Sequence, residues 1–184
     1  MQALAGASGL PVKIVPAMDM PVVVEDAGTF AGNARKKALA LQAVRPTGAW
    51  VLADDSGLCV DALGGEPGVE SAYYAGPQGD YAANLRKLTE VMRDVPDDRR
   101  GAHFVCVLVL RGPGGAEKMF EGRCPGTLRR EPAGCSGFGY DPLFIPDGHD
   151  RTYAELPEAE KHKISHRGCA WHLLADWFRS DSPA

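Results

Sequence analysis

Two adjacent carboxylates, Asp54 and Asp55, follow a short apolar run of the chain, Ala49–Ala53. Such a run is typical of a buried central strand, and functional sites are commonly built just past the ends of buried strands. Two carboxylates there could bind Mg²⁺, activate a water molecule, or divide these two tasks. The alternative is that Asp54–Gly57 is only a turn, and the local sequence favours neither interpretation.

The segment from Thr29 to about Val44 is predicted to form a helix that begins after Glu25 and contains Lys37. Thr29 is a suitable N-cap, and apolar residues recur at helical spacing at Phe30, Ala34, Ala38 and Leu41. Glu25 is a candidate second metal ligand, and Lys37 could contact phosphate oxygens near such a metal. Considered alone, Lys37 is better explained as an exposed lysine in a basic helix face.

The stretch Ser136–Phe144 has the composition of a ligand-binding loop. Its two glycines permit backbone conformations that are closed to other residues, and Phe138 and Tyr140 provide flat aromatic faces. Asp141 adds an acceptor just before a proline. An aromatic base could stack there, although Gly-aromatic loops are common and a motif of this kind matches by chance in many proteins.

Polar donors gather before a helix predicted over Ser165–Ser180. Lys161, His166 and Arg167 supply three cationic or hydrogen-bonding groups, and Ser165 is placed to cap a helix whose N-terminus favours negative charge. A stacking surface followed by these donors suits a nucleotide. The alternative is an ordinary solvated cluster at a helix start.

The remaining segments predict an α/β or α+β domain with a mixed sheet flanked by helices. Strands are predicted at Val12–Val15, Ala49–Ala53, Leu58–Leu63, Ala102–Leu110, Glu117–Arg123 and Gly126–Arg130. Asp80 is predicted to cap a further helix that ends before Pro96, and the strands around Arg111–Gly115 are predicted to form a hairpin. These elements must position the candidate residues.

Composition excludes several classes of function. The chain has 184 residues and a net charge of −4, which argues against a nucleic-acid partner because nucleic-acid binders normally carry a basic excess. Its five cysteines are scattered and contain no Cys-x-x-Cys pair, which favours a reducing compartment. No apolar run is long enough for a membrane span, and the sequence predicts a cytoplasmic protein without a membrane partner.

Four ordered motifs together resemble those of the inosine triphosphate pyrophosphatase family. They are Thr29–Ala38, Leu52–Leu58 with Gly64–Gly68 and Ser71-Ala72, Ser136–Phe144, and Ala154–Leu156 with Lys161 and Ser165–Arg167. The resemblance extends from about Glu25 to the C-terminus. It implies an elongated α/β fold with a central mixed sheet, two lobes and a nucleotide cleft between them.

The resemblance also implies a function. Family members are Mg²⁺-dependent homodimers that hydrolyse non-canonical purine nucleoside triphosphates, such as ITP, dITP and XTP, to the monophosphate and pyrophosphate. The substrate is therefore a small molecule, and the reaction removes these compounds from the nucleotide pool. A metal ion that neutralises charge on the phosphates makes a covalent nucleophile unnecessary.

Site residues follow from the motif positions. Asp55 and Asp54 would be catalytic, with Asp55 orienting or deprotonating the attacking water, and Glu25 and Asp55 would bind the metal. Lys37 and Lys161 would contact the phosphates. The base-binding residues would be Ser56, Phe138, Tyr140, Asp141, Ser165, His166 and Arg167.

The chain departs from the family pattern at its start. The resemblance predicts a first strand and a Thr/Ser-x-Asn-x-x-Lys phosphate loop, but Met1–Leu4 matches the end of the helix that would follow them. We therefore expect residues 1–184 to form a single domain of this family that lacks that strand and loop. The alternative function is a nucleotide-binding homologue whose catalysis is impaired by this loss.

Overall fold

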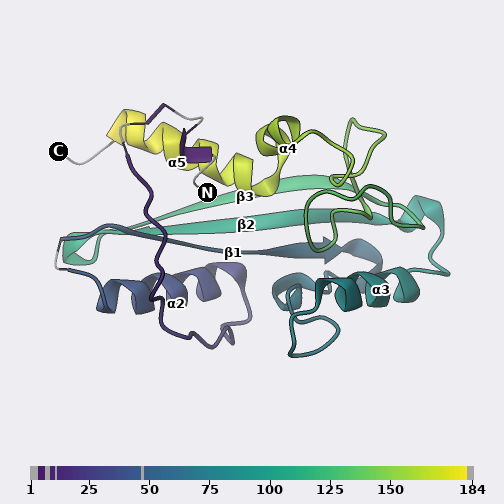
Figure 1. Cartoon of the computed structure of the whole chain (residues 1–184), viewed down its shortest axis with the longest axis horizontal. Coiled ribbons are helices and arrows are strands. Elements are labelled where there is room, and N and C mark those ends of the chain that lie inside the picture. Colours follow the sequence, from purple (N-terminus) through teal and green to yellow (C-terminus); the bar gives the residue numbers. More distant parts are fainter. Residues whose placement is uncertain (1–3, 7–8, 11, 47, 182–184) are drawn as a thin grey trace. The chain divides into compact units, whose positions relative to one another are not determined.

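The computed structural model describes residues 4–6, 9–10, 12–46 and 48–181, and the chain divides into two compact units (Figure 1). Unit 1 comprises Met1–Asp55, Cys106–Gly122 and His166–Ala184, and unit 2 comprises Ser56–Val105 and Arg123–Ser165. The helix end expected at the start of the chain involves Met1, Gln2 and Ala3, which lie outside the described residues.

One four-stranded antiparallel sheet contributes strands to both units. Its strands are β1 (Val51–Val60), β2 (Gly101–Arg111), β3 (Glu117–Leu128) and β4 (Phe144–Pro146), in the order β1-β2-β3-β4. The predicted β2–β3 hairpin is confirmed, and its turn is closed by the Gly112 N–H donating to the Ala116 carbonyl at 2.9 Å. In the last pair, Thr127 of β3 lies opposite Ile145 of β4.

β1 is longer than predicted: the strand does not end at Ala53, and the alternative that Asp54–Gly57 is only a turn is wrong. These residues lie inside one continuous strand that also includes most of the segment predicted as a second strand. Burial alternates along it: Val51, Ala53 and Asp55 are buried, whereas the residues between them are half-buried. Ion pairs formed by the two aspartates explain how a strand tolerates polar residues that are otherwise typical of turns.

Two other strand predictions also need correction. Glu117–Arg123 and Gly126–Arg130 were expected as separate strands, but β3 continues through both to Leu128. Val12–Val15 was expected as a strand, yet residues 12–17 have no regular secondary structure. A four-residue segment with three apolar residues cannot by itself distinguish a strand from an extended segment that packs on other elements.

The described residues include the helices α2 (Phe30–Ala43), α3 (Tyr81–Val91), α4 (Glu158–Ile164) and α5 (His166–Asp181). The N-caps predicted at Thr29 and Asp80 are confirmed, since the Thr29 hydroxyl accepts from Gly32 N and the Asp80 carboxylate accepts from Ala82 N. In unit 1, α2 and α5 lie on opposite sides of the strands (Figure 1). Among the described residues, no helix combines the length and apolar character that crossing a bilayer requires.

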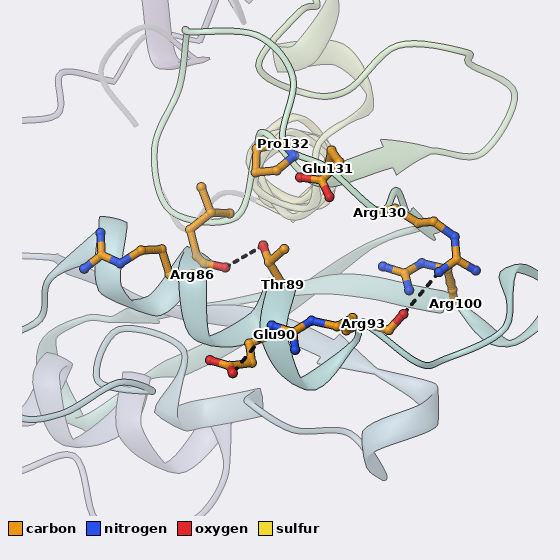
Figure 2. A pocket seen from close by; sticks show the side chains of 9 residues that line it. Arg86, Thr89, Glu90, Arg93, Arg100, Arg130, Glu131 and Pro132 are labelled. Atoms are coloured by element: carbon orange, nitrogen blue, oxygen red, sulfur yellow. Dashed lines mark hydrogen bonds and ion pairs between the residues drawn. The ribbon is translucent and has the colours of Figure 1, made fainter.

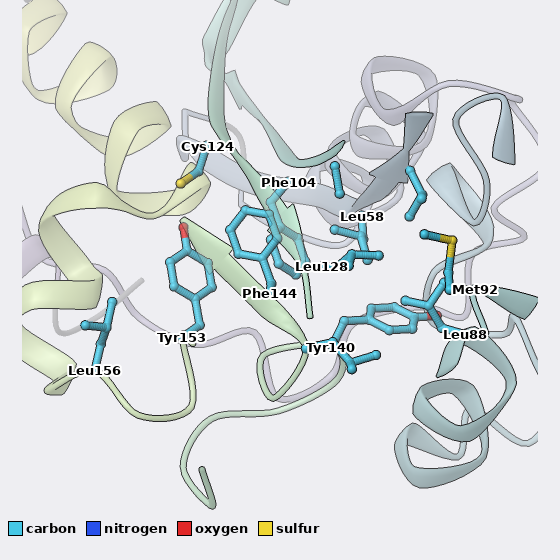
Figure 3. Close-up of a cluster of buried hydrophobic side chains, with 13 residues drawn as sticks. Leu58, Leu88, Met92, Phe104, Cys124, Leu128, Tyr140, Phe144, Tyr153 and Leu156 are labelled. Atoms are coloured by element: carbon cyan, nitrogen blue, oxygen red, sulfur yellow. The ribbon is translucent and has the colours of Figure 1, made fainter. Parts of the chain in front are cut away.

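Each unit has its own hydrophobic core. In unit 2 the rings of Phe104, Phe144 and Tyr153 pack together, with centroid separations of 4.8, 4.9 and 5.8 Å (Figure 3). In unit 1, Trp171 and Leu174 of α5 pack on Leu108 of β2. Aromatic and aliphatic burial of this kind supplies most of the stability of a small domain.

A buried arginine joins α3 to the end of β3 in unit 2. Arg100 is 3% exposed, and its guanidinium donates to the carbonyls of Met92 (2.6 Å), Leu128 (2.7 Å) and Arg129 (2.9 Å). It lines a cavity of about 490 Å³ together with residues of α3 and of the segment after β3 (Figure 2). Because its donors satisfy main-chain carbonyls, the role of Arg100 is to hold these elements together.

Substitution of Gly122 tests how closely α5 packs on β3 in unit 1. A Cβ at this position would lie 2.2 Å from Ala170 N and from the His166 carbonyl oxygen. We expect Gly122→Ala to lower stability by about 1–3 kcal/mol, because either the strand or the helix must move. Thermal unfolding measures this change as a lower Tm. Gly6→Ala is the control, since Gly6 is helical and a Cβ there meets nothing within 4 Å; equal Tm values for the two variants would contradict the packing.

Candidate active site

In unit 1 a lysine ammonium lies between the two predicted metal-binding carboxylates. Lys37 Nζ is 2.6 Å from Glu25 Oε2 and 2.8 Å from Asp55 Oδ1, and it also donates to the Asp54 carbonyl at 3.4 Å. Lys37 comes from α2, Asp55 from β1, and Glu25 from the segment before α2. The structure therefore brings these three predicted residues together.

A buried asparagine fixes Asp55 from the same helix. Asn33 is fully buried, its Nδ2 donates to Asp55 Oδ2 at 3.2 Å, and its Oδ1 accepts from Ala27 N at 3.0 Å. Asp55 thus has one oxygen on Lys37 and the other on Asn33. Because both oxygens are held, the orientation of the carboxylate is set by α2 and by the segment that precedes it.

The pKa values of the Asp55 carboxyl and the Lys37 ammonium are both raised, for different reasons. Burial raises the pKa of the Asp55 carboxyl above its usual value and the Glu25 charge adds to this, whereas Lys37 and Asn33 oppose it. Burial also disfavours the charged form of Lys37, but its bonds to Asp55 and Glu25 outweigh this and raise the pKa of the ammonium. A buried carboxyl with a raised pKa is a candidate proton acceptor.

Asp54 has different partners from Asp55. Asp54 Oδ2 accepts from Arg167 Nε at 3.3 Å, and Arg167 Nη1 lies 3.5 Å from His166 Nε2. Successive strand residues point to opposite faces of a sheet, so Asp54 pairs with α5 while Asp55 pairs with α2. The structure therefore separates the two aspartate side chains, which were expected to lie beside one metal ion.

Glu25 and Asp55 fit a divalent cation. Their oxygens converge on one cationic atom, Lys37 Nζ, and both are hard oxygen donors. The described residues contain no group of three or more His, Cys, Asp or Glu side chains that could hold a metal. Two carboxylates nevertheless suffice for Mg²⁺, which usually keeps several waters and takes further oxygens from a phosphate substrate.

A second group of predicted residues lies in unit 2. Lys161, from α4, pairs with Asp141, and its ammonium lies 5.4 Å from the centroid of the Phe138 ring. Asp141 Oδ2 also accepts from Phe138 N at 2.8 Å. A Cβ on Gly137, whose φ is +79°, would meet that carboxylate oxygen at 2.1 Å, so the turn requires glycine there.

Phe138 and Tyr140 have opposite environments, although the sequence predicts both to contact a base. Phe138 is 53% exposed and can offer a face to a ligand, whereas Tyr140 is 4% exposed within the unit 2 core. The Tyr140 hydroxyl donates to the Ser71 carbonyl at 2.8 Å. Tyr140 therefore anchors the loop in place of stacking on a base, and Asp141, 3% exposed, is likewise held by protein partners.

The remaining predicted residues are placed as follows. Ser56 is half-buried in β1 and is the first residue of unit 2. Ser165 is buried between α4 and α5, and its N–H donates to the Lys161 carbonyl at 2.9 Å. His166 is buried as the first residue of α5, and Arg167 follows it with a side chain 31% exposed.

Sequence reasoning missed the buried asparagines that organise both groups. Asn33 lies on the apolar side of α2 with Ala34 and Ala38, where an unpaired amide would be costly, and this position is the signal that could have revealed its role. Asn84 of α3 is 1% exposed; its Oδ1 accepts from Ala75 N at 2.7 Å and its Nδ2 donates to the Ala72 carbonyl at 2.8 Å.

Asn33→Ala tests the support of Asp55. We expect a loss of about 1–3 kcal/mol in stability, because the Ala27 N–H and one Asp55 oxygen lose a partner. The pKa of Asp55 should rise further, since a hydrogen bond to its ionised form is removed. Thermal unfolding and NMR titration of the carboxyl measure the two changes. The control is Leu39→Ala on the exposed face of α2; an unshifted Asp55 titration in Asn33→Ala would contradict the role of Asn33.

Known proteins match nearly the whole chain. The model of the Ham1 family matches residues 1–177. A dITP/XTP pyrophosphatase from Opitutus terrae is 64% identical over 160 residues, which are 87% of this chain and 79% of that protein. A dITP/XTP pyrophosphatase from Streptomyces coelicolor is 49% identical over 177 residues, with 95% and 88% coverage.

A solved structure agrees with these matches. A HAM1 protein from Coxiella burnetii is 38% identical, covers 96% of this chain and 93% of its own, and superposes with a TM-score of 0.85. Fold and sequence thus agree over the segments that carry both groups of site residues. The chain belongs to the Ham1 family.

Proposed function

We propose that this protein hydrolyses non-canonical purine nucleoside triphosphates, with ITP, dITP and XTP as substrates, to the monophosphate and pyrophosphate. The reaction adds one water across the α–β phosphoanhydride and removes these nucleotides from the pool. Relatives that share up to 64% of aligned residues bear the name dITP/XTP pyrophosphatase. The structural observation that carries the proposal is the convergence of Glu25 and Asp55 on one cationic atom, Lys37 Nζ.

Mg²⁺ is the proposed cofactor, and Glu25 and Asp55 are the residues that would hold it. When bound, it would neutralise negative charge on the phosphates and on the leaving pyrophosphate. Lys37 pairs with the same two carboxylates that would bind the ion. When the ion occupies those carboxylates, the Lys37 ammonium is available to a phosphate oxygen. Lys161 is the second proposed phosphate contact.

Asp55 is the proposed proton acceptor for the attacking water. Its raised pKa brings the carboxyl closer to neutral pH, where a general base is most effective, and Asn33 and Lys37 hold its two oxygens in a fixed orientation. The proton of the water passes to this carboxylate as the water oxygen bonds to phosphorus and the bridging oxygen leaves with pyrophosphate.

Arg167 and His166 are the proposed donors to the 6-oxo group of the base, with Phe138 as the stacking surface and Ser56 and Ser165 as further contacts. Adenine presents an amino donor where inosine and xanthine present an acceptor, so these donors would be left unpaired against it. Asp54 orients the Arg167 guanidinium through its 3.3 Å hydrogen bond. We therefore assign Asp54 to base recognition through Arg167.

The assembly proposed is a homodimer that acts on a small molecule in the cytoplasm, without a nucleic-acid partner. Its support is the family membership together with the acidic net charge of −4. Residues 1–184 are proposed to act as one domain of this family.

Pyrophosphate release from ITP, XTP, GTP and ATP, each with and without Mg²⁺, tests the function. We expect release from ITP and XTP only when Mg²⁺ is present, and much slower release from GTP and ATP. EDTA should abolish it, and added Mg²⁺ should restore it. Equal rates on all four nucleotides, or no release from any, would contradict the proposal.

Asp55→Asn and Asp54→Asn should separate chemistry from base recognition in that assay. Loss of the proton acceptor in Asp55→Asn should lower kcat by about 10²–10⁴-fold.

Asp54→Asn should retain most turnover of ITP but lower the preference for ITP over ATP, because Arg167 loses its charged partner. Asp26→Asn is the matched control, since Asp26 is an exposed carboxylate next to Glu25. Full activity in Asp55→Asn, or the same kcat loss in both aspartate variants, would refute these separate roles.

A further inference from the structure

Two half-exposed aromatic rings meet at the surface of unit 2. Tyr81 and Phe138 are each 53% exposed, their ring centroids are 6.0 Å apart, and their planes are tilted by 48°. Tyr81 begins α3 and Phe138 lies in the loop before β4, so the contact joins segments far apart in the sequence. Large aromatic side chains that stay exposed next to one another commonly mark a ligand-binding surface.

The loop that carries Phe138 and the first turn of α3 are both attached to one main-chain oxygen. The Ser71 carbonyl accepts from Tyr140 OH at 2.8 Å and from Asn84 Nδ2 at 3.3 Å. Tyr140 belongs to the same loop as Phe138, and Asn84 lies one turn after Tyr81 in α3. The loop and the helix start are therefore attached to the same main-chain atom.

One cation, the Lys161 ammonium, lies beside the pair and is itself paired with Asp141. Lys161 Nζ lies 5.4 Å from the Phe138 ring centroid and 5.1 Å from that of Tyr153, so the Phe138 ring has a cation near it as well as Tyr81. Because the two rings are tilted and not parallel, they form a corner. A planar ring system can stack on one face and touch the edge of the other.

We propose that Tyr81 is a base-contacting residue, and that Tyr81 and Phe138 form an aromatic corner that receives the purine ring of the substrate. The proposal rests on the function proposed above. It adds a residue from α3 to the base site, outside all four sequence motifs that carry the family resemblance. A bicyclic purine covers more of such a corner than a pyrimidine does, so Tyr81 contributes to the preference for purines.

Tyr81→Ala is the test, with Tyr81→Phe as the conservative variant. We expect Tyr81→Ala to raise KM for ITP about five- to tenfold, because the ring supplies one side of the corner, while kcat stays within about twofold. Tyr81→Phe should restore the wild-type KM because it keeps the ring. The control is Val91→Ala, which removes exposed apolar surface from the other end of α3.

Binding of ITP in EDTA, measured by calorimetry, gives a readout that does not depend on turnover. A five- to tenfold weaker affinity of Tyr81→Ala supports the corner even if the wild-type chain releases no pyrophosphate, an outcome that would overturn the proposed hydrolysis alone. Equal affinity and equal KM in wild type and Tyr81→Ala would overturn the role of Tyr81. A loss in Tyr81→Phe as large as in Tyr81→Ala would also overturn it.

Discussion

The reactive group of unit 1 depends on one partly buried cation, the Lys37 ammonium between Glu25 and Asp55. The side chains of Lys37 and Asp55 are 17% and 8% exposed, so water screens their charges weakly. Two carboxylates this close repel one another, and burial makes ionisation of Asp55 costly. The ammonium opposes both effects, which allows the two carboxylates to lie close together.

Unit 2 depends on satisfied polar groups in a similar way. Ser71 lies at the centre of a hydrogen-bond network. Its hydroxyl accepts from Leu58 N and donates to the Gly68 carbonyl. Its own carbonyl accepts from the side chains of Asn84 and Tyr140. A fully satisfied buried network of this kind specifies one arrangement of the loops that it joins. The exposed Phe138 can therefore stand at the surface without its loop collapsing onto the core.

Helix positions were predictable from sequence because capping and apolar spacing are local properties, as α2 and α3 show. The strand conformation of Asp54–Gly57 was not predictable, because polar residues that favour a turn are held in β1 by partners distant in the sequence. Phe138 and Tyr140 look alike in the motif, and only tertiary packing decides which one is buried. The contact of Asp54 with Arg167 joins residues 113 positions apart, beyond the reach of any local pattern.

Successive side chains of β1 face opposite sides of the sheet, so the register of this strand decides which partners each aspartate meets. Asp54 and Asp55 have different partners only because neighbouring strand residues face opposite ways. A slip of one residue would reverse the faces of the two side chains, turning the carboxylate paired with Arg167 towards the face of α2 and the other towards the face of α5. Insertions and deletions before this point of the strand are therefore far more damaging than substitutions, since a single residue gained or lost would turn both carboxylates away from their partners at once.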